Sequence, residues 1–207
     1  MTDNVVRDLT GAVAEPRHDP SGHLQALQAR LAAQAAQAGI LDIAYRTLET
    51  PVGPLLLAAT ERGLVRIAYA SEDHDAVLQA LADRISPRIL HAPGRLDTAA
   101  AELDEYFSGC RRGFGLPLDW QLSAGFRRTV LQHLAHDVGY GHTASYGAIA
   151  RLAGSPRAVR AVGTACATNP LPVVVPCHRV VRSDGRTGGY LGGPEAKRIL
   201  LALEAAA

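Results

Sequence analysis

Residues 169–181 read NPLPVVVPCHRVV, and this stretch decides the interpretation of the whole chain. It sets Cys177 between a proline and a histidine at the end of an apolar run. A nucleophilic cysteine needs a basic partner and a positive environment that favours the thiolate, and His178 and Arg179 follow directly. The three prolines of the stretch restrict its backbone. This pattern predicts a reactive thiol held at the mouth of a pocket.

A plainer interpretation is also open for the same residues. The run 173–175 is rich in valine and is typical of a buried strand, of which Cys177 would be the last core residue. Motifs on both sides favour the reactive interpretation. These are SYGAIARLAG from 145, RAVG at 160–163, NP at 169–170, PCHRV at 176–180 and GGYLGG at 188–193.

In that order and at those spacings, the chain resembles the O6-alkylguanine-DNA alkyltransferase family, also called methylated-DNA–protein-cysteine methyltransferases. The resemblance is dense over 125–204 and fainter over 42–120. PCHRV together with RAVG and NP is far more specific than a lone Cys-His pair. The resemblance implies an α/β fold, with an N-terminal ribonuclease H-like lobe built on an antiparallel sheet. The C-terminal lobe would be helical and winged-helix-like, with a helix-turn-helix.

The same resemblance implies a DNA-repair activity. The alkyl group of O6-alkylguanine, or of O4-alkylthymine, in double-stranded DNA would pass irreversibly to Cys177. Because the product is a thioether, each molecule would act once. No cofactor is implied, and the protein is expected to act as a monomer.

Site residues carry over from the family position by position. Cys177 would accept the alkyl group, His178 would act on the thiol through a water, and Glu204 would hold that histidine. Tyr146 would supply a proton to the leaving guanine, and Asn169 would brace the turn after the recognition helix. Considered alone, Glu204 would pass for a solvated helix residue and Tyr146 for a half-buried anchor.

A base inside a duplex cannot reach a cysteine in a pocket, so the target nucleotide must rotate out of the stack. By resemblance Arg160 fills the vacated space, while Ala161 and Gly163 let their helix approach the minor groove closely, with Tyr146 also at the DNA. The glycine-rich loop after 187 would form part of the pocket. The walls of this pocket are assigned to Pro172, Val180, Gly188, Gly189, Tyr190 and Leu191. Leu191 replaces a small residue of the family, which suggests a narrower pocket.

The net charge of +1 hides an asymmetry between the two halves. Residues 121–207 carry ten Arg and Lys against four Asp and Glu, while residues 41–120 carry eight against twelve. The C-terminal half, at +6, is therefore the one suited to a polyanion, although a solvated basic face is the alternative. Arginine supplies twenty of the twenty-one basic residues, and its planar fork suits phosphate contacts.

Composition and cysteine usage narrow the class of protein further. No apolar run approaches the roughly 20 residues that span a bilayer, and residues 1–10 lack the pattern of a secretory signal. Three cysteines cannot pair completely, which favours the cytoplasm. Their spacing fits no zinc motif, and the histidines are scattered.

Three segments follow from the pattern: an extension at 1–40, an α/β lobe at 41–120 and a DNA-binding lobe at 121–207. The extension is predicted to be a floppy tail followed by a surface helix. Runs at 42–50, 53–60 and 63–70 predict an antiparallel meander, followed by helices at 72–85 and 97–107. A helix around 126–134 and short helices at 144–153 and 156–167 follow, with Ser155 expected to cap the last and Pro156 in its first turn.

Two rival functions remain at this point. An alkyltransferase-like protein would bind lesions without chemistry, but such proteins replace the cysteine that this chain keeps. A transcriptional sensor that reads its own alkylation would need an extra regulatory domain, for which 40 residues are too few.

Overall fold

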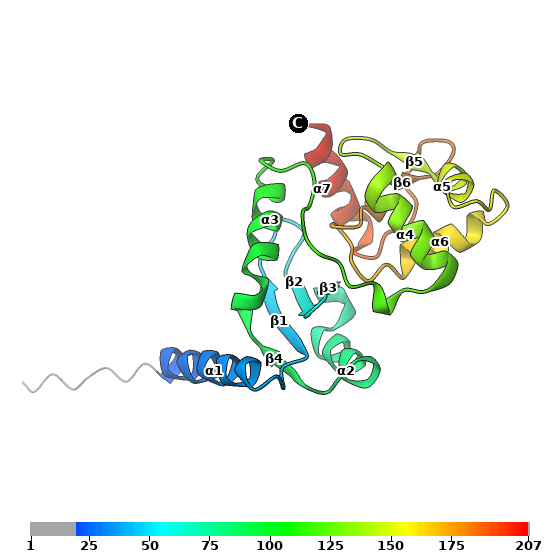
Figure 1. Ribbon diagram of the computed structural model, residues 1–207. Coiled ribbons are helices and arrows are strands. Elements are labelled where there is room, and N and C mark those ends of the chain that lie inside the picture. The colour runs from blue at the N-terminus through cyan, green and yellow to red at the C-terminus, as the bar shows by residue number, and fades with distance from the viewer. Residues whose placement is uncertain (1–19, 207) are drawn as a thin grey trace, which may run out of the picture.

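The computed structural model describes residues 20–206, and the floppy tail expected before them lies outside this range. The predicted surface helix is α1 (Pro20–Gln37). Ala32 and Ala35 are buried on it and pack with Ala44 and Ala92 of the α/β lobe. Figure 1 shows α1 alongside β4, at the end of the molecule opposite the C-terminus.

The antiparallel meander is present and gains a fourth strand. Strands β1 (Ile43–Leu48), β2 (Leu55–Thr60) and β3 (Gly63–Tyr69) pair in antiparallel fashion. Strand β4 (Ile89–His91), which the sequence did not predict, pairs parallel with β1 and completes the order β3-β2-β1-β4. Its three residues are too few to show a period of two, so pairing with β1 rather than local pattern makes it a strand.

Both faces of this sheet are covered. On one face of the sheet, Leu56, Ala58 and Val65 pack against Val77 and Leu81 of α2 (His74–Arg84). Alternate residues such as Leu55 and Leu57 face α3 (Asp97–Phe107) and the second lobe. The helix expected from 72 begins at His74 instead, after a 3-10 turn η1 (Ala70–Glu72), because the Asp73 carboxylate accepts hydrogen bonds from the backbone N–H groups of residues 75 and 76.

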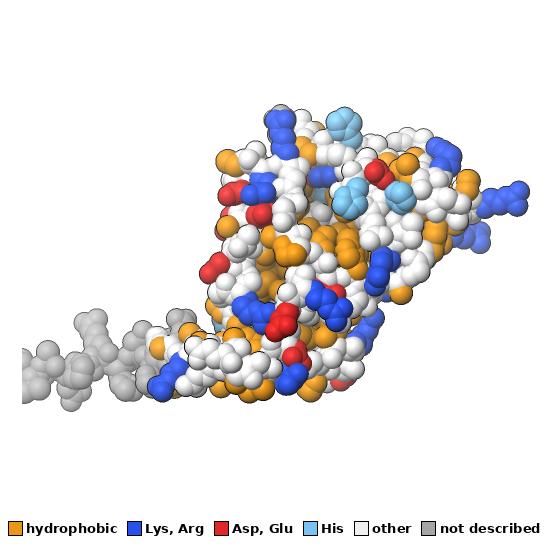
Figure 2. Space-filling model, in the orientation of Figure 1, with side chains coloured by type: hydrophobic (Ala, Val, Ile, Leu, Met, Phe, Trp, Pro, Cys, Tyr) orange, Lys and Arg blue, Asp and Glu red, His pale blue; other side chains and the backbone are white. Residues whose placement is uncertain are grey.

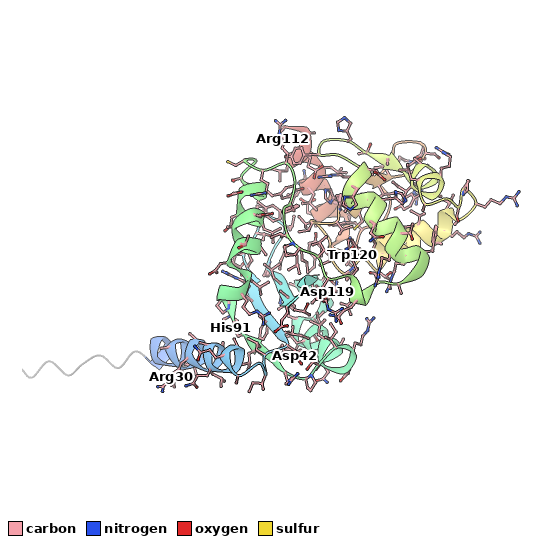
Figure 3. The ribbon with its side chains drawn as sticks, viewed as in Figure 1. Arg30, Asp42, His91, Arg112, Asp119 and Trp120 are labelled. Atoms are coloured by element: carbon pink, nitrogen blue, oxygen red, sulfur yellow. The ribbon has the colours of Figure 1, made fainter. Side chains whose placement is uncertain are left out.

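The connection between the lobes is fastened to the sheet. After β4, a 3-10 turn η2 (Pro93–Leu96) leads into α3. Beyond α3 the chain runs past β3, where the Leu64 N–H donates to the Pro117 carbonyl over 2.8 Å and the Asp119 N–H donates to the Leu64 carbonyl over 2.8 Å. A Cβ on Gly63 would lie 2.1 Å from the Pro117 oxygen, so only glycine permits this approach. Asp119 also starts the 3-10 turn η3 (Trp120–Leu122), and Figure 3 shows both residues between the lobes.

The second lobe is mainly helical, with α4 (Gly125–Asp137), α5 (Tyr146–Leu152), α6 (Val159–Ala167) and α7 (Gly193–Ala205). Two short strands, β5 (Ala144–Ser145) and β6 (Val180–Val181), pair in parallel, and β5 occupies the predicted start of the first short helix. Figure 1 shows α7 lying between α3 and the other helices of this lobe. Residues of both lobes form one continuous core.

Helices α5 and α6 form the predicted pair, but the expected start of α6 is wrong. The helix begins at Val159, and its first turn has no side-chain cap. Ser155 belongs to the turn between the helices, where its backbone N–H donates to Ala150 and its carbonyl accepts from Ala158. Pro156 lies in this turn as well, so the connection is longer than the Gly154-Ser155 pair alone.

The alternative of a buried strand at 173–175 is also wrong. These residues are fully buried, but they form a turn in which Val173 has a φ of +72°. A β-branched residue in this left-handed region is strained, by about 1–3 kcal/mol, and such strain is held only where surrounding contacts fix the backbone.

None of the helices within residues 20–206 is long and apolar enough to cross a membrane.

Candidate functional site

The turn that carries Cys177 is held by one buried side chain, Asn169. Its Oδ1 accepts a hydrogen bond from the Leu171 N–H at 3.0 Å, and its Nδ2 donates to the Val175 carbonyl at 2.9 Å. The same Nδ2 lies 3.1 Å from Sγ of Cys177. Asn169 therefore spans the strained turn and also presents an N–H to the sulfur. The 3-10 turn η4 (Cys177–Arg179) follows.

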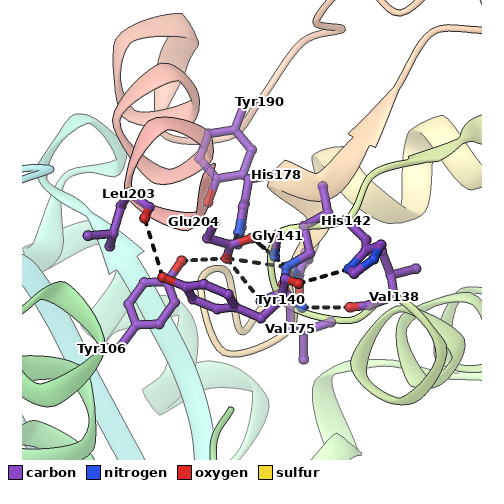
Figure 4. Close-up of polar contacts among 12 residues, drawn as sticks. Tyr106, Val138, Tyr140, Gly141, His142, Val175, His178, Tyr190, Leu203 and Glu204 are labelled. Carbon is purple, nitrogen blue, oxygen red and sulfur yellow. Dashed lines mark hydrogen bonds and ion pairs between the residues drawn. The ribbon is translucent and has the colours of Figure 1, made fainter. Parts of the chain in front are cut away.

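His178 and Glu204 form a fully buried pair next to the thiol. Nε2 of His178 lies 2.8 Å from Oε1 of Glu204 (Figure 4). Burial raises the pKa of Glu204, but hydrogen bonds from His178 and Arg179 outweigh this effect and hold the pKa at about 2. An ionised carboxylate only accepts, so Nε2 carries the proton and Nδ1 carries the lone pair. Nδ1 is buried and has no hydrogen-bond partner within residues 20–206, which leaves it able to accept a proton.

Arg179 and Tyr106 fix the other edges of the Glu204 carboxylate. Arg179 donates from Nε and Nη2 to the two carboxylate oxygens, each at 2.9 Å, and from Nη1 to the Val138 carbonyl. The Tyr106 hydroxyl, which comes from α3 of the first lobe, donates to Oε1 at 2.7 Å. The expectation that Arg179 gives the thiol a positive environment is therefore wrong, because its charge is paired with Glu204.

The thiol itself is neutral at rest. Burial raises the pKa of Cys177 to about 11, while the Asn169 amide and the charge of Lys197 oppose that rise. Lys197 is itself buried, and its Nζ donates to the Val180 carbonyl at 2.7 Å. Burial lowers the pKa of His178 below its usual 6.5, so His178 is neutral near pH 7. The site therefore holds a thiol and a neutral base rather than a preformed ion pair.

A hollow of about 460 Å³ lies beside the thiol, between α6 and the loop 188–191. It is lined by Tyr146, Gly163, Cys166, Ala167, Gly189, Tyr190 and Leu191. Cys177 is only 2% exposed and is not itself part of this lining. Its ionised form would raise the pKa values of Tyr146, Cys166 and Tyr190, all of which line the hollow. The Tyr190 hydroxyl is fixed by the Tyr69 hydroxyl of β3, 2.8 Å away.

The structure brings together most of the residues assigned to the pocket. Gly188 contacts the end of the Tyr146 ring, since a Cβ on this glycine would lie 2.5 Å from the tyrosine hydroxyl. Burial raises the pKa of Tyr146, which keeps its hydroxyl protonated. Pro172 and Val180 are buried in the core instead and are not part of the lining of this hollow.

The residues assigned to DNA lie on the outer face of α6. Arg160 and Ala161 are exposed, and Gly163 is half-buried. A Cβ on Gly163 would meet no atom within 4 Å, so a glycine here serves no internal packing and leaves the helix surface flat. Arg160 lies about one turn before Gly163, the first residue of α6 that lines the hollow, and about two turns before Cys166 and Ala167.

Sequence reasoning missed Tyr106, Lys197 and the pairing of Arg179. A signal for Lys197 was present, because Lys197, Leu200 and Glu204 follow the i, i+3, i+7 spacing of one helix face. With Leu200 in the core, the two charged residues of that face had to be buried. Tyr106 gave no such signal, since it is one of several apolar residues on α3.

With this geometry established, comparisons with known proteins identify the family. The model of the 6-O-methylguanine DNA methyltransferase ribonuclease-like domain matches residues 43–120, and that of the DNA binding domain matches residues 125–206. The methylated-DNA–protein-cysteine methyltransferase of Methanosarcina barkeri is 38% identical over 160 residues, which are 77% of this chain and 96% of that protein. The chain belongs to the 6-O-methylguanine DNA methyltransferase family. The resemblance and the two-lobed fold predicted from the sequence are thereby confirmed.

Solved structures of this family have the same architecture. The crystal structure of Mycobacterium tuberculosis O6-methylguanine methyltransferase superposes with a TM-score of 0.69 at 35% identity, covering 79% of this chain and 93% of that one. A structure of the Mycobacterium tuberculosis protein in complex with DNA gives a TM-score of 0.68 at 36% identity, with the same coverage of both chains. Residues 20–37, which form α1, precede the matched region of the family models.

The buried His178–Glu204 pair makes the free energy of unfolding depend on pH. The pKa of Glu204 is about 2 in the folded chain against 4.5 ordinarily, and that of His178 is also lowered. Both groups bind protons more weakly when folded, so stability is fully present above pH 6.5 and falls as the pH drops. We expect the free energy of unfolding, measured in urea, to fall below pH 6.5 and to lose about 3 kcal/mol more between pH 4.5 and pH 2. Unfolding energies that stay constant or rise toward acid would contradict this assignment.

Proposed function

We propose that the protein repairs DNA by moving an alkyl group from O6 of guanine to Cys177. The observation that carries this proposal is the arrangement at the thiol. A buried cysteine, an amide donor and an oriented base lie together next to a hollow walled by two tyrosines. Family membership supports the same reaction, since relatives are named methylated-DNA–protein-cysteine methyltransferases.

The proposed reaction is a displacement at the alkyl carbon. Sγ of Cys177 forms a bond to that carbon as the bond from carbon to O6 breaks, and the electron pair stays on guanine. The thiol proton leaves toward Nδ1 of His178 through a bridging water, and Tyr146 delivers a proton to the guanine ring. The proton held by His178 then returns through solvent to the Tyr146 phenolate, which restores both groups. The net products are a Cys177 thioether and unmodified guanine, so the chain consumes one thiol per lesion.

The neutral resting thiol fits this scheme. A pKa of about 11 leaves little thiolate at pH 7, so the proton must move as the substrate reacts. His178 is already neutral and oriented by Glu204, and no group has to reorganise first. Nucleophilic chemistry of this kind relies on a nucleophile, a base and an orienting group. Cys177, His178 and Glu204 are proposed for these three roles, and Asn169 for holding the sulfur.

We propose double-stranded DNA as the partner, bound by the exposed face of α6. A DNA-bound structure exists for the Mycobacterium tuberculosis relative, and residues 125–206 match a DNA-binding domain of the family. A single copy contains every residue proposed for the reaction, so a monomer suffices. The three cysteines are unpaired thiols, which supports a reducing compartment such as the cytoplasm.

Removing the Tyr146 hydroxyl tests its proposed role as proton donor. Tyr146→Phe keeps the ring that packs on Gly188, so DNA binding should change by less than about twofold. The alkyl-transfer rate should fall by about 100-fold, which is typical for loss of a general acid. Single-turnover rates with an O6-methylguanine duplex measure this effect. An unchanged rate would exclude Tyr146 as the donor.

Arg160 is proposed to occupy the space that the rotated nucleotide leaves. Arg160→Ala should lower the rate with an O6-methylguanine duplex by about tenfold or more, because base extrusion costs a few kcal/mol. The loss should be much smaller with free O6-benzylguanine, which needs no extrusion. The test is the ratio of the two rates in the variant and in the wild type. Equal losses on both substrates would contradict this role.

The reaction itself is tested with a duplex whose O6-methyl group carries deuterium. The intact protein should gain the mass of one trideuteromethyl group in place of hydrogen, and the DNA should afterwards contain guanine. Protein of unchanged mass, with the lesion bound but intact, would instead indicate a lesion-binding protein without transfer activity.

A further inference from the structure

A second hollow of about 460 Å³ lies between the two lobes. It is bounded by α2 on one side and by residues 167–170, at the end of α6, on the other. Figure 1 shows α2 below α4 and α6 in this region. Ala167 and Leu191 line this hollow and also the hollow beside Cys177, so the two are adjacent along the surface.

Charged side chains from both lobes line the inter-lobe hollow. Arg66 and Arg84 come from the first lobe and Arg127 from the second, while Glu72 is the only carboxylate among the lining residues. Three positive charges against one negative charge leave an excess of two. Figure 2 shows Lys and Arg side chains where the two lobes meet on this side of the molecule.

Two of these arginines are fixed in place by the protein. Arg66 forms an ion pair with Glu72 and donates to the Pro170 carbonyl at 3.3 Å, and Arg127 donates to the Leu122 carbonyl. Arg84 differs from both. It lies in the last turn of α2, is exposed, and forms no ion pair with any residue between 20 and 206. Its guanidinium is therefore free to bind an anion that enters the hollow.

The position of the hollow indicates which anion it fits. Arg160 lies near the start of α6. The hollow beside Cys177, called the reaction hollow below, lies along the rest of this helix, and the inter-lobe hollow lies beyond its end. Helix α6 spans about 12 Å, and the phosphates of one strand recur about every 3.4 Å along the axis of a duplex. A strand that passes α6 with its target nucleotide in the reaction hollow would place a later phosphate at the inter-lobe hollow.

We propose that this hollow binds a backbone phosphate of the DNA strand next to the target nucleotide, with Arg84 as its principal contact. The inference rests on the proposed function, because it assumes that the strand lies along α6. It assigns DNA contact to the first lobe, although residues 41–120 carry a net charge of −4. Arg66 and Arg127 add positive potential without leaving their carbonyl partners.

The dependence of binding on salt tests this contact. Each neutralised phosphate contributes about 0.9 to the slope of log K against log salt concentration on duplex DNA. We expect Arg84→Ala to reduce the magnitude of the slope by about 0.9, and Arg84→Lys to retain the wild-type slope, because lysine keeps the charge. Fluorescence anisotropy with an undamaged duplex avoids any reaction during the titration. Thermal unfolding checks that each variant is folded.

Arg30→Ala is the matched control. Arg30 is an exposed arginine of the N-terminal extension, and Figure 3 shows it on α1, far from α6. The control removes the same charge and should leave the slope unchanged. Equal slopes for wild type and Arg84→Ala, or equal reductions for Arg84→Ala and Arg30→Ala, would overturn the proposal.

A titration with inorganic phosphate distinguishes a phosphate of the DNA backbone from a free anion as the ligand of the inter-lobe hollow. If the hollow serves only a free anion, phosphate will raise the melting temperature of the wild type more than that of Arg84→Ala while the DNA slopes stay equal, which overturns the proposal. The proposed function fails separately, if the wild type transfers no alkyl group from an O6-methylguanine duplex. A wild type that transfers normally, with an Arg84→Ala slope equal to its own, refutes only the phosphate site.

Discussion

Cys177→Ala should abolish alkyl transfer while leaving binding to an O6-methylguanine duplex within a few-fold of the wild type. The sulfur is the only atom proposed to bond to the alkyl carbon, and no neighbour can replace it. Burial raises the pKa of Cys166 even above that of Cys177, although Cys166 lines the same hollow. The measurement pairs a transfer assay by mass spectrometry with an anisotropy titration on the same duplex.

Cys166→Ala is the matched control for this substitution. It removes a buried thiol at the wall of the hollow but leaves Asn169, His178 and Glu204 in place, so transfer should persist. Residual transfer by Cys177→Ala, or loss of transfer by Cys166→Ala alone in a folded protein, would indicate Cys166 as the nucleophile instead of Cys177.

Glu204→Ala should destabilise the protein by about 3–5 kcal/mol, the usual cost of leaving a buried ionic partner without its counter-charge. The carboxylate is buried, and its loss leaves the Arg179 guanidinium, the Tyr106 hydroxyl and Nε2 of His178 without their acceptor. For a chain of this size, the melting temperature should fall by about 10 °C. Calorimetry or thermal circular dichroism would measure the change.

Glu195→Ala gives the comparison on the same helix. Glu195 pairs with Arg198, but both side chains are about two-thirds exposed, so its removal should cost less than about 1 kcal/mol. Similar losses for the two variants would show that the buried network does not stabilise the fold as described.

The sequence predicted elements whose pattern is local and long. Helix α3 has the predicted bounds of 97 and 107, and the three antiparallel strands lie within their predicted runs. What it could not predict depends on contacts between distant residues. Strand β4 is defined by β1, and the turn at Val173 is imposed on a run of valines by the side chain of Asn169. Propensity favours a strand there, but tertiary contacts override it.

The candidate site shows the same division. The motif around Cys177 and His178 indicated the nucleophile and its neighbour, and family resemblance supplied Glu204 and Tyr146. The protonation state of the thiol was not predictable, because burial outweighs nearby charges in a way that a list of neighbours does not show. The pairing of Arg179 with Glu204, 25 residues away, likewise depends on how α7 packs.

The stoichiometry and location of the transferred group decide whether Cys177 is the acceptor. The protein should be incubated with increasing amounts of O6-methylguanine duplex. Its intact mass should then be measured by mass spectrometry, and a digest should be used for peptide mapping. We expect a plateau at one methyl group per active molecule, located on Cys177, with Cys110 and Cys166 unmodified. Repair that continues beyond one equivalent, or a methyl group on any other residue, would contradict it.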